Sequence, residues 1–170
     1  MPPPDADPFL QTARLVPVAY ALHVLEEAPG FAPWVRRHAA RDYTDAEFVR
    51  INSVGFVSTL AATAALVRGR RGGFAYYTVV LTQQALWNPV FHAGTTVAWG
   101  EYSPGLVTSI VVFLPLWALA TRRAVNAGQL SPRRITVAVT LGGAIHAAAV
   151  ADQVFHVRRR HDAARNEDRT

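Results

Sequence analysis

The chain has 170 residues, of which 51% are hydrophobic. Its formal net charge of +5 comes from 17 arginines and no lysine, but these arginines stand in short connections and in the last residues rather than on one face with interleaved aromatic residues. The charge therefore does not indicate nucleic-acid binding. With no cysteine, the chain has neither a disulfide framework nor thiolate chemistry.

Long runs without a charged residue predict helices that cross a membrane. The four runs are 51–67, 72–100, 102–121 and 135–151. A spanning helix needs about 20 mostly apolar residues to cross the hydrocarbon core. The segment 8–28 is a fifth candidate, although Arg14 and Pro17 interrupt it. A soluble bundle is the weaker interpretation, because such runs leave too little polar surface to cover a core. We predict an all-α integral membrane bundle of about five transmembrane helices.

Capping residues and breakers give the boundaries of these helices. Asp7-Pro8, Ser103-Pro104 and Ser131-Pro132 are N-cap and proline pairs, and Thr44 with Glu47 forms a capping box. The predicted helices are 8–28, 45–68, 73–99, 104–125 and 132–158. They form one transmembrane domain, 1–158, which a polar, arginine-rich tail, 159–170, follows.

Polar side chains collect in one half of the predicted bundle. Because successive helices alternate in direction, the end of the first, the start of the second and the ends of the third and fifth helices share one side of the membrane. The residues concerned are His23, Glu26, Glu27, Asn52, Asn88, His92 and His146. Ionisable side chains within a membrane are costly and usually functional. We therefore predict a cavity that is open to one side.

Spacing within the helices supports convergence of these side chains. His23 with Glu26 and Glu27 is an i, i+3, i+4 set, so the imidazole and at least one carboxylate share a face. Gln84, Asn88, His92 and Thr96 follow one another at i+4. Small residues beside His146, including Gly142 and Gly143, allow close approach of the last helix.

Histidine and carboxylate at this spacing are typical ligands of zinc and iron in helical bundles. The predicted metal ligands are His23, Glu26, Glu27, His92 and His146, for a divalent ion such as Zn or Fe. Asn52 and Asn88 would orient the substrate. Too few carboxylates are present for a dinuclear centre of the ferritin type. No organic cofactor is indicated.

Other interpretations of the same residues stay open. His23 and a glutamate can act as acid and base without metal, as in an isomerase or cyclase. The cluster can also be the binding site of a small transporter, although the nearly apolar opposite half argues against a path through the membrane. His92 and His146 can each be neutral and bonded to a backbone carbonyl. Ser103 is interpreted as a helix cap, and His156 as a solvated residue at the membrane exit.

Several motifs together resemble one family. They are the pentad His23-Val-Leu-Glu26-Glu27, the segment Asn88-Pro-Val-Phe-His92, the run from Tyr102 to Ser109, and His146 in a helix of small residues. Over residues 15 to 150 the chain resembles the HXXEE-domain membrane proteins. The resemblance implies a small helical membrane protein, suspected to be an enzyme, in which His23, Glu26 and Glu27 give the family its name. It implies no particular reaction.

These observations predict a membrane-embedded, metal-dependent enzyme of the cell membrane. Its expected partners are the lipid bilayer and a lipid-soluble or amphipathic small molecule that enters from one leaflet. The expected catalytic residues are His23, Glu26, Glu27, Asn52 and Asn88. The connections at 68–71 and 122–134 carry seven arginines, so the positive-inside rule places them in the cytoplasm and the polar cluster on the outer side.

Overall fold

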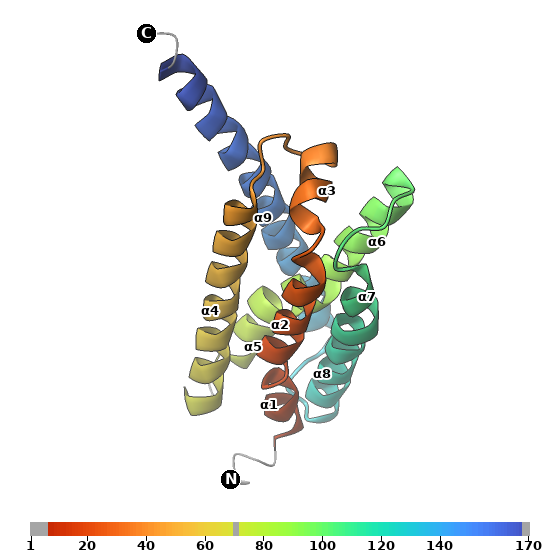
Figure 1. Cartoon of the computed structure of the whole chain (residues 1–170). Coiled ribbons are helices and arrows are strands. Elements are labelled where there is room, and N and C mark those ends of the chain that lie inside the picture. Colours follow the sequence, from red (N-terminus) through yellow and green to blue (C-terminus); the bar gives the residue numbers. More distant parts are fainter. Residues whose placement is uncertain (1–6, 70–71, 168–170) are drawn as a thin grey trace.

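The protein is all helical. The computed structural model describes residues 7–69 and 72–167, with side chains as far as residue 155, and this part of the chain contains no strand. Figure 1 shows the helices in chain order: α1 (Pro8–Ala13), α2 (Val16–Glu27), α3 (Phe31–His38), α4 (Asp45–Gly69), α5 (Gly73–Tyr76), the π-helix η2 (Tyr77–Trp87), α6 (Asn88–Trp99), α7 (Leu106–Thr108), the π-helix η3 (Ser109–Phe113), α8 (Leu114–Asn126) and α9 (Pro132–Glu167). The all-α prediction is confirmed.

Three helical segments are long and apolar enough to cross a membrane: Asp45–Gly69, Leu106–Asn126 and Pro132–Phe155. The sequence predicted about five such segments. The first predicted span is divided into α1 and α2 by a turn at Arg14 and Leu15, just before Pro17, which lacks an N–H for a helical hydrogen bond. The third predicted span is continuous from α5 to α6, but η2 changes its helical geometry.

Two other boundaries differ from the predicted ones. After Pro29 and Gly30 the chain forms the short helix α3, for which no helix was predicted. The last helix continues to Glu167, so the backbone of the predicted tail is helical over most of its length.

The predicted caps of the first two helical regions are present. The Phe9 N–H donates to Asp7 Oδ1 over 2.9 Å at the start of α1. At the start of α4, the Thr44 N–H donates to Glu47 Oε2 over 2.8 Å and the Glu47 N–H donates to Thr44 Oγ1 over 3.1 Å. These reciprocal bonds form the capping box expected from the sequence.

The last helix packs closely against η2 through glycines. A Cβ atom at Gly142 would lie 2.9 Å from Thr82 Cγ2, and one at Gly143 would lie 2.7 Å from Trp87 Cε2. The Trp87 indole N–H donates to the Val139 carbonyl over 2.8 Å. The predicted close approach of the last helix is therefore confirmed at these glycines.

Two hydrophobic clusters meet at the polar residues. The larger includes Leu81 and Phe113, and the smaller surrounds Trp34. The His23 ring lies 5.1 Å from the Phe113 ring, and the His92 ring lies 6.3 Å from that of Phe31, which packs on the smaller cluster. The polar residues are thus held between two apolar cores rather than at the surface.

Candidate metal centre

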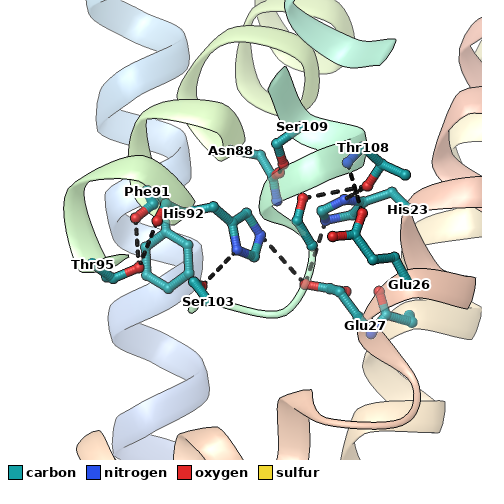
Figure 2. Close-up of polar contacts among 12 residues, drawn as sticks. His23, Glu26, Glu27, Asn88, Phe91, His92, Thr95, Ser103, Thr108 and Ser109 are labelled. Carbon is teal, nitrogen blue, oxygen red and sulfur yellow. Dashed lines mark hydrogen bonds and ion pairs between the residues drawn. The ribbon is translucent and has the colours of Figure 1, made fainter. Parts of the chain in front are cut away.

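Three of the predicted ligands converge. His23 and Glu27 lie one turn apart on α2, and His92 comes from α6, with one possible ligand atom of each within 4.8 Å of the others. The two imidazole Nε2 atoms lie 3.4 Å (His23) and 3.5 Å (His92) from the same oxygen, Glu27 Oε1. The three residues are only 3%, 5% and 0% exposed for His23, Glu27 and His92. Figure 2 shows the Glu27 carboxylate between the two rings.

Hydroxyl groups fix the other nitrogen of each ring. His23 Nδ1 lies 2.9 Å from Thr108 Oγ1, and His92 Nδ1 lies 2.8 Å from Ser103 Oγ (Figure 2). The Thr108 hydroxyl donates to the Gly105 carbonyl over 3.3 Å, so its oxygen accepts a hydrogen bond from the His23 Nδ1–H group. The lone pair of His23 then lies on Nε2, facing the carboxylate. Such bonds to the far nitrogen orient metal-binding histidines.

Both Nε2 atoms are buried without a hydrogen-bond partner in the described part of the chain. A buried, unpaired polar atom is costly, and a lone pair facing a carboxylate oxygen is repelled by it. A cation, or a proton held between the groups, removes this repulsion. The three side chains therefore have the chemistry of a cation site or of a proton-sharing cluster.

The connection between α6 and α7 brings backbone against these side chains. Figure 1 shows it returning along α6 from the end of that helix. Gly105 lies here with φ of 102°, and a Cβ atom at this position would be 2.6 Å from His23 Cε1, 2.8 Å from His92 Cε1 and 3.0 Å from Glu27 Cγ. Any side chain would both adopt a strained conformation and collide with all three residues. Glycine is thus required for the cluster to form.

Glu26, also predicted as a possible ligand, does not belong to the cluster of His23, Glu27 and His92. Its carboxylate accepts hydrogen bonds from the backbone N–H groups of Val107 (2.9 Å) and Thr108 (2.7 Å), and from the Tyr102 hydroxyl. Burial, with the neighbouring Glu26 carboxylate, raises the pKa of Tyr102 to about 12, so the phenol keeps its proton and donates it. Glu26 thereby attaches the start of α7 to α2 and leaves Glu27 alone to face the imidazoles.

The two predicted asparagines lie beside the cluster without entering it. Asn88 Oδ1 accepts from the Ser109 hydroxyl over 2.9 Å. Asn52 Oδ1 accepts from the Tyr20 hydroxyl over 3.1 Å, and its Nδ2 donates to the Phe48 carbonyl over 3.2 Å. Both line a cavity that also reaches the three clustered side chains.

The cavity has a volume of about 530 Å³. Its lining comes from α2, α3, α4, η2, α6, η3 and α9 and from the connection before α4. His146, on α9, lines it but does not belong to the cluster of His23, Glu27 and His92. Its ring instead lies 6.0 Å from that of Phe91, which in turn lies 5.2 Å from the ring of His92. The side chain of His156 lies outside the described residues.

Sequence reasoning missed the supporting residues of the centre. Ser103 was interpreted as a helix cap, yet its hydroxyl bonds to His92 and the helix begins only at Leu106. Thr108 and Gly105 were not singled out. A glycine directly after Ser103-Pro104 is a weak signal for a positive φ, but the sequence does not indicate that this turn reaches two histidines.

Comparison with known proteins gives one match. The model of the family described as "protein of unknown function with HXXEE motif" matches residues 14–120. The matched segment holds His23, Glu27 and His92 with their supporting residues, and it ends before α9. No curated protein and no solved structure matches the chain. Because the match covers more than half of its length, the chain belongs to the HXXEE family.

Proposed function

We propose that the protein is a membrane-embedded, metal-dependent enzyme in which His23, Glu27 and His92 bind a divalent ion, Zn or Fe. One observation carries the proposal: two buried imidazole nitrogens without hydrogen-bond partners in the described chain face the same carboxylate oxygen. Their other nitrogens are already bonded to Thr108 and Ser103.

The distances agree with a shared ion. Metal bonds to imidazole nitrogen and carboxylate oxygen are about 2.0 to 2.2 Å long, so two such ligands at a tetrahedral angle lie about 3.3 to 3.6 Å apart. The observed separations from Glu27 Oε1 are 3.4 Å and 3.5 Å. Direct hydrogen bonds between the same atoms would be shorter, mostly 2.7 to 3.2 Å.

Two histidines and one carboxylate leave coordination positions free, as in catalytic zinc sites and in non-haem iron enzymes. An ion there would polarise a bound oxygen or activate water. The residues of this chain would hold it at the cavity wall, exclude bulk water and orient the substrate through Asn88 and Asn52. The burial of the centre and the cavity beside it favour a lipid-soluble or amphipathic substrate.

We further propose that the chain crosses the cell membrane five times. Beyond the three apolar helices, α2 exposes Val18 (59%), Leu22 (47%) and Leu25 (70%) along one face, and α6 exposes Val97 (84%). Apolar side chains exposed at helical spacing are expected against lipid and not against water. With the arginine-rich connections in the cytoplasm, the centre would open to the outer side.

The test compares Glu27→Gln with Glu26→Gln, two identical changes at adjacent positions. We expect wild-type protein, purified in detergent without chelator, to contain close to one equivalent of Zn or Fe by elemental analysis. Glu27→Gln should lose at least about nine-tenths of it, since an amide is a poor ligand. Glu26→Gln should keep it, because the amide oxygen can still accept a hydrogen bond from the start of α7.

Equal metal content in wild type and Glu27→Gln would contradict the proposal. So would wild-type protein that holds no Zn or Fe and gains no thermal stability when either is added. In that case, an acid/base reaction by His23 and Glu27 would replace the metal-dependent one.

A further inference from the structure

Unpaired polar atoms gather around one cavity. Among the described residues, seven buried side-chain nitrogen and oxygen atoms have no hydrogen-bond partner. Six belong to residues that line the cavity of about 530 Å³: His23, Trp34, Tyr43, Gln84, His92 and His146. The seventh, Trp117 Nε1, lies elsewhere. The two imidazoles of the proposed centre account for two of the six, so four remain for a ligand.

The charges around the cavity define the kind of ligand. Its lining contains one carboxylate, Glu27, and no lysine or arginine among the described residues. Away from the proposed centre, a buried carboxylate or phosphate on a ligand would have no cationic side chain to pair with. Most of the remaining wall is apolar, including Ala62, Val79, Val80, Phe113 and Val150. An uncharged, largely apolar molecule is therefore favoured.

Three of these four atoms come from two parts of the wall, the segment from α3 to α4 and the π-helix η2. Trp34 on α3 and Tyr43 before α4 are almost fully buried, at 1% and 3% exposure, and Trp34 Nε1 can only donate. Gln84, on η2, donates its Nε2 to Thr59 Oγ1 over 2.6 Å, which leaves Oε1 as a free acceptor. The first part can therefore bind an acceptor oxygen of a ligand, and the second can bind a ligand hydroxyl group that donates.

We propose that the cavity binds an uncharged, hydrophobic molecule with oxygen groups at two separated positions. One oxygen, of a hydroxyl or carbonyl group, accepts from Trp34 and Tyr43, and a hydroxyl group donates to Gln84. The cavity size is in the usual range for small-molecule sites, about 300 to 1,000 Å³. As the substrate class of the proposed enzyme, this assignment rests on the proposed function, but binding itself does not require the metal.

The experiment uses chelator-treated protein in detergent. The probes are α,ω-alkanediols with chains of eight to fourteen carbons, and the dicarboxylates of the same chain lengths at neutral pH. Apparent dissociation constants come from the rise of the melting temperature with probe concentration. We expect the best diol to bind at least about tenfold more tightly than its dicarboxylate. Trp34→Phe and Gln84→Leu should each weaken diol binding about fivefold to tenfold.

Trp117→Phe is the matched control, because it removes an equally unpaired indole N–H outside the cavity, and diol binding should stay at the wild-type level. If Trp34→Phe or Gln84→Leu binds the diol as tightly as Trp117→Phe does, recognition at two positions is wrong. Tight binding of the dicarboxylate, or no stabilisation by any diol, would overturn the ligand class. Since metal is absent throughout, these outcomes are independent of the metal content of Glu27→Gln.

Discussion

At the scale of single residues, adjacent acids on α2 have separate tasks. Successive side chains of a helix point about 100° apart. The connection between α6 and α7, with the start of α7, contacts both acids: Val107 and Thr108 bond to Glu26, and Gly105 lies against Glu27. Glu26 accepts hydrogen bonds from the backbone N–H groups of Val107 and Thr108, while Glu27 faces two imidazoles. Glu26 fixes the position of the start of α7, and with it Gly105 and Thr108. The arrangement of Glu27 and the two imidazoles depends on these two residues.

Gly105→Ala tests the backbone contact with the centre. We expect it to lower the free energy of unfolding by at least about 2 kcal/mol more than Gly100→Ala does, and to abolish metal binding. Both glycines have positive φ, 102° at Gly105 and 61° at Gly100. The conformational cost of a side chain is about 1 to 2 kcal/mol at Gly100 and larger at Gly105, whose φ lies outside the left-handed helical region. Only at Gly105 does the new methyl meet His23 and His92. Thermal unfolding and elemental analysis measure the two effects; equal losses in both variants would disprove the contact argument.

Ser103→Ala and Thr108→Val test the hydroxyls behind the imidazoles. Each should weaken metal affinity about tenfold to a hundredfold while leaving the three ligands in place, because the rings lose the bond that orients them. Thr121→Val is the control, since its hydroxyl bonds to Tyr77 and not to a histidine. Metal titration of the chelator-treated variants measures the change. An affinity unchanged from that of Thr121→Val would mean that the hydroxyls do not support the centre.

At the scale of helices, the predicted segments are helical over most of their length, but their breaks and internal geometry could not be read from the sequence. Apolar and polar patterns predict where a helix runs, but not that part of it is a π-helix. In η2 the Thr82 hydroxyl donates to the Tyr77 carbonyl, five residues back, over 2.6 Å, and the Thr82 side chain also faces Gly142 of α9. The i+4 stripe of Gln84, Asn88 and His92 was derived for a regular α-helix, yet all three line the cavity. Short α3 is amphipathic, with Ala32, Trp34 and Val35 buried, but it has only eight residues and contains Pro33, so no helix was predicted there.

Gly142→Ala tests the contact between α9 and η2. Its methyl would lie 3.0 Å from the Thr78 carbonyl oxygen, a backbone atom that cannot rotate away. We expect a loss of about 1 to 3 kcal/mol in unfolding free energy. Gly94→Ala, in α6 with no described atom within 4 Å of the new methyl, should instead be neutral or stabilise by up to about 1 kcal/mol. Denaturation in detergent measures the change in unfolding free energy of both variants. An equal loss in Gly142→Ala and Gly94→Ala would contradict the packing argument.

At the scale of the whole molecule, the sequence predicted the helical class and the convergence of His23, Glu27 and His92, because helix alternation places their positions on one side. It could not predict the roles of Glu26, Ser103 or Gly105. Those depend on the returning connection between α6 and α7, whose path follows from long-range contacts rather than from local pattern.

The membrane topology distinguishes a chain that crosses the membrane five times from one that crosses it three times. With five, a reporter inserted at Gly69 and one fused after Thr170 should lie in opposite compartments, since three spans separate them. If only the three apolar helices cross, two spans separate these positions and the reporters share a compartment. Activity of paired periplasmic and cytoplasmic reporters measures this. A reporter inserted at Arg41 compared with one at the N-terminus tests the α1–α2 span in the same way.

The family match ends at residue 120, whereas α9, which forms one wall of the cavity and carries His146, begins at Pro132. The three proposed metal ligands therefore lie inside the matched segment, whereas one wall of the cavity lies outside it. Substitutions on α9 can reshape the cavity without moving a proposed metal ligand, because those ligands come from α2 and α6.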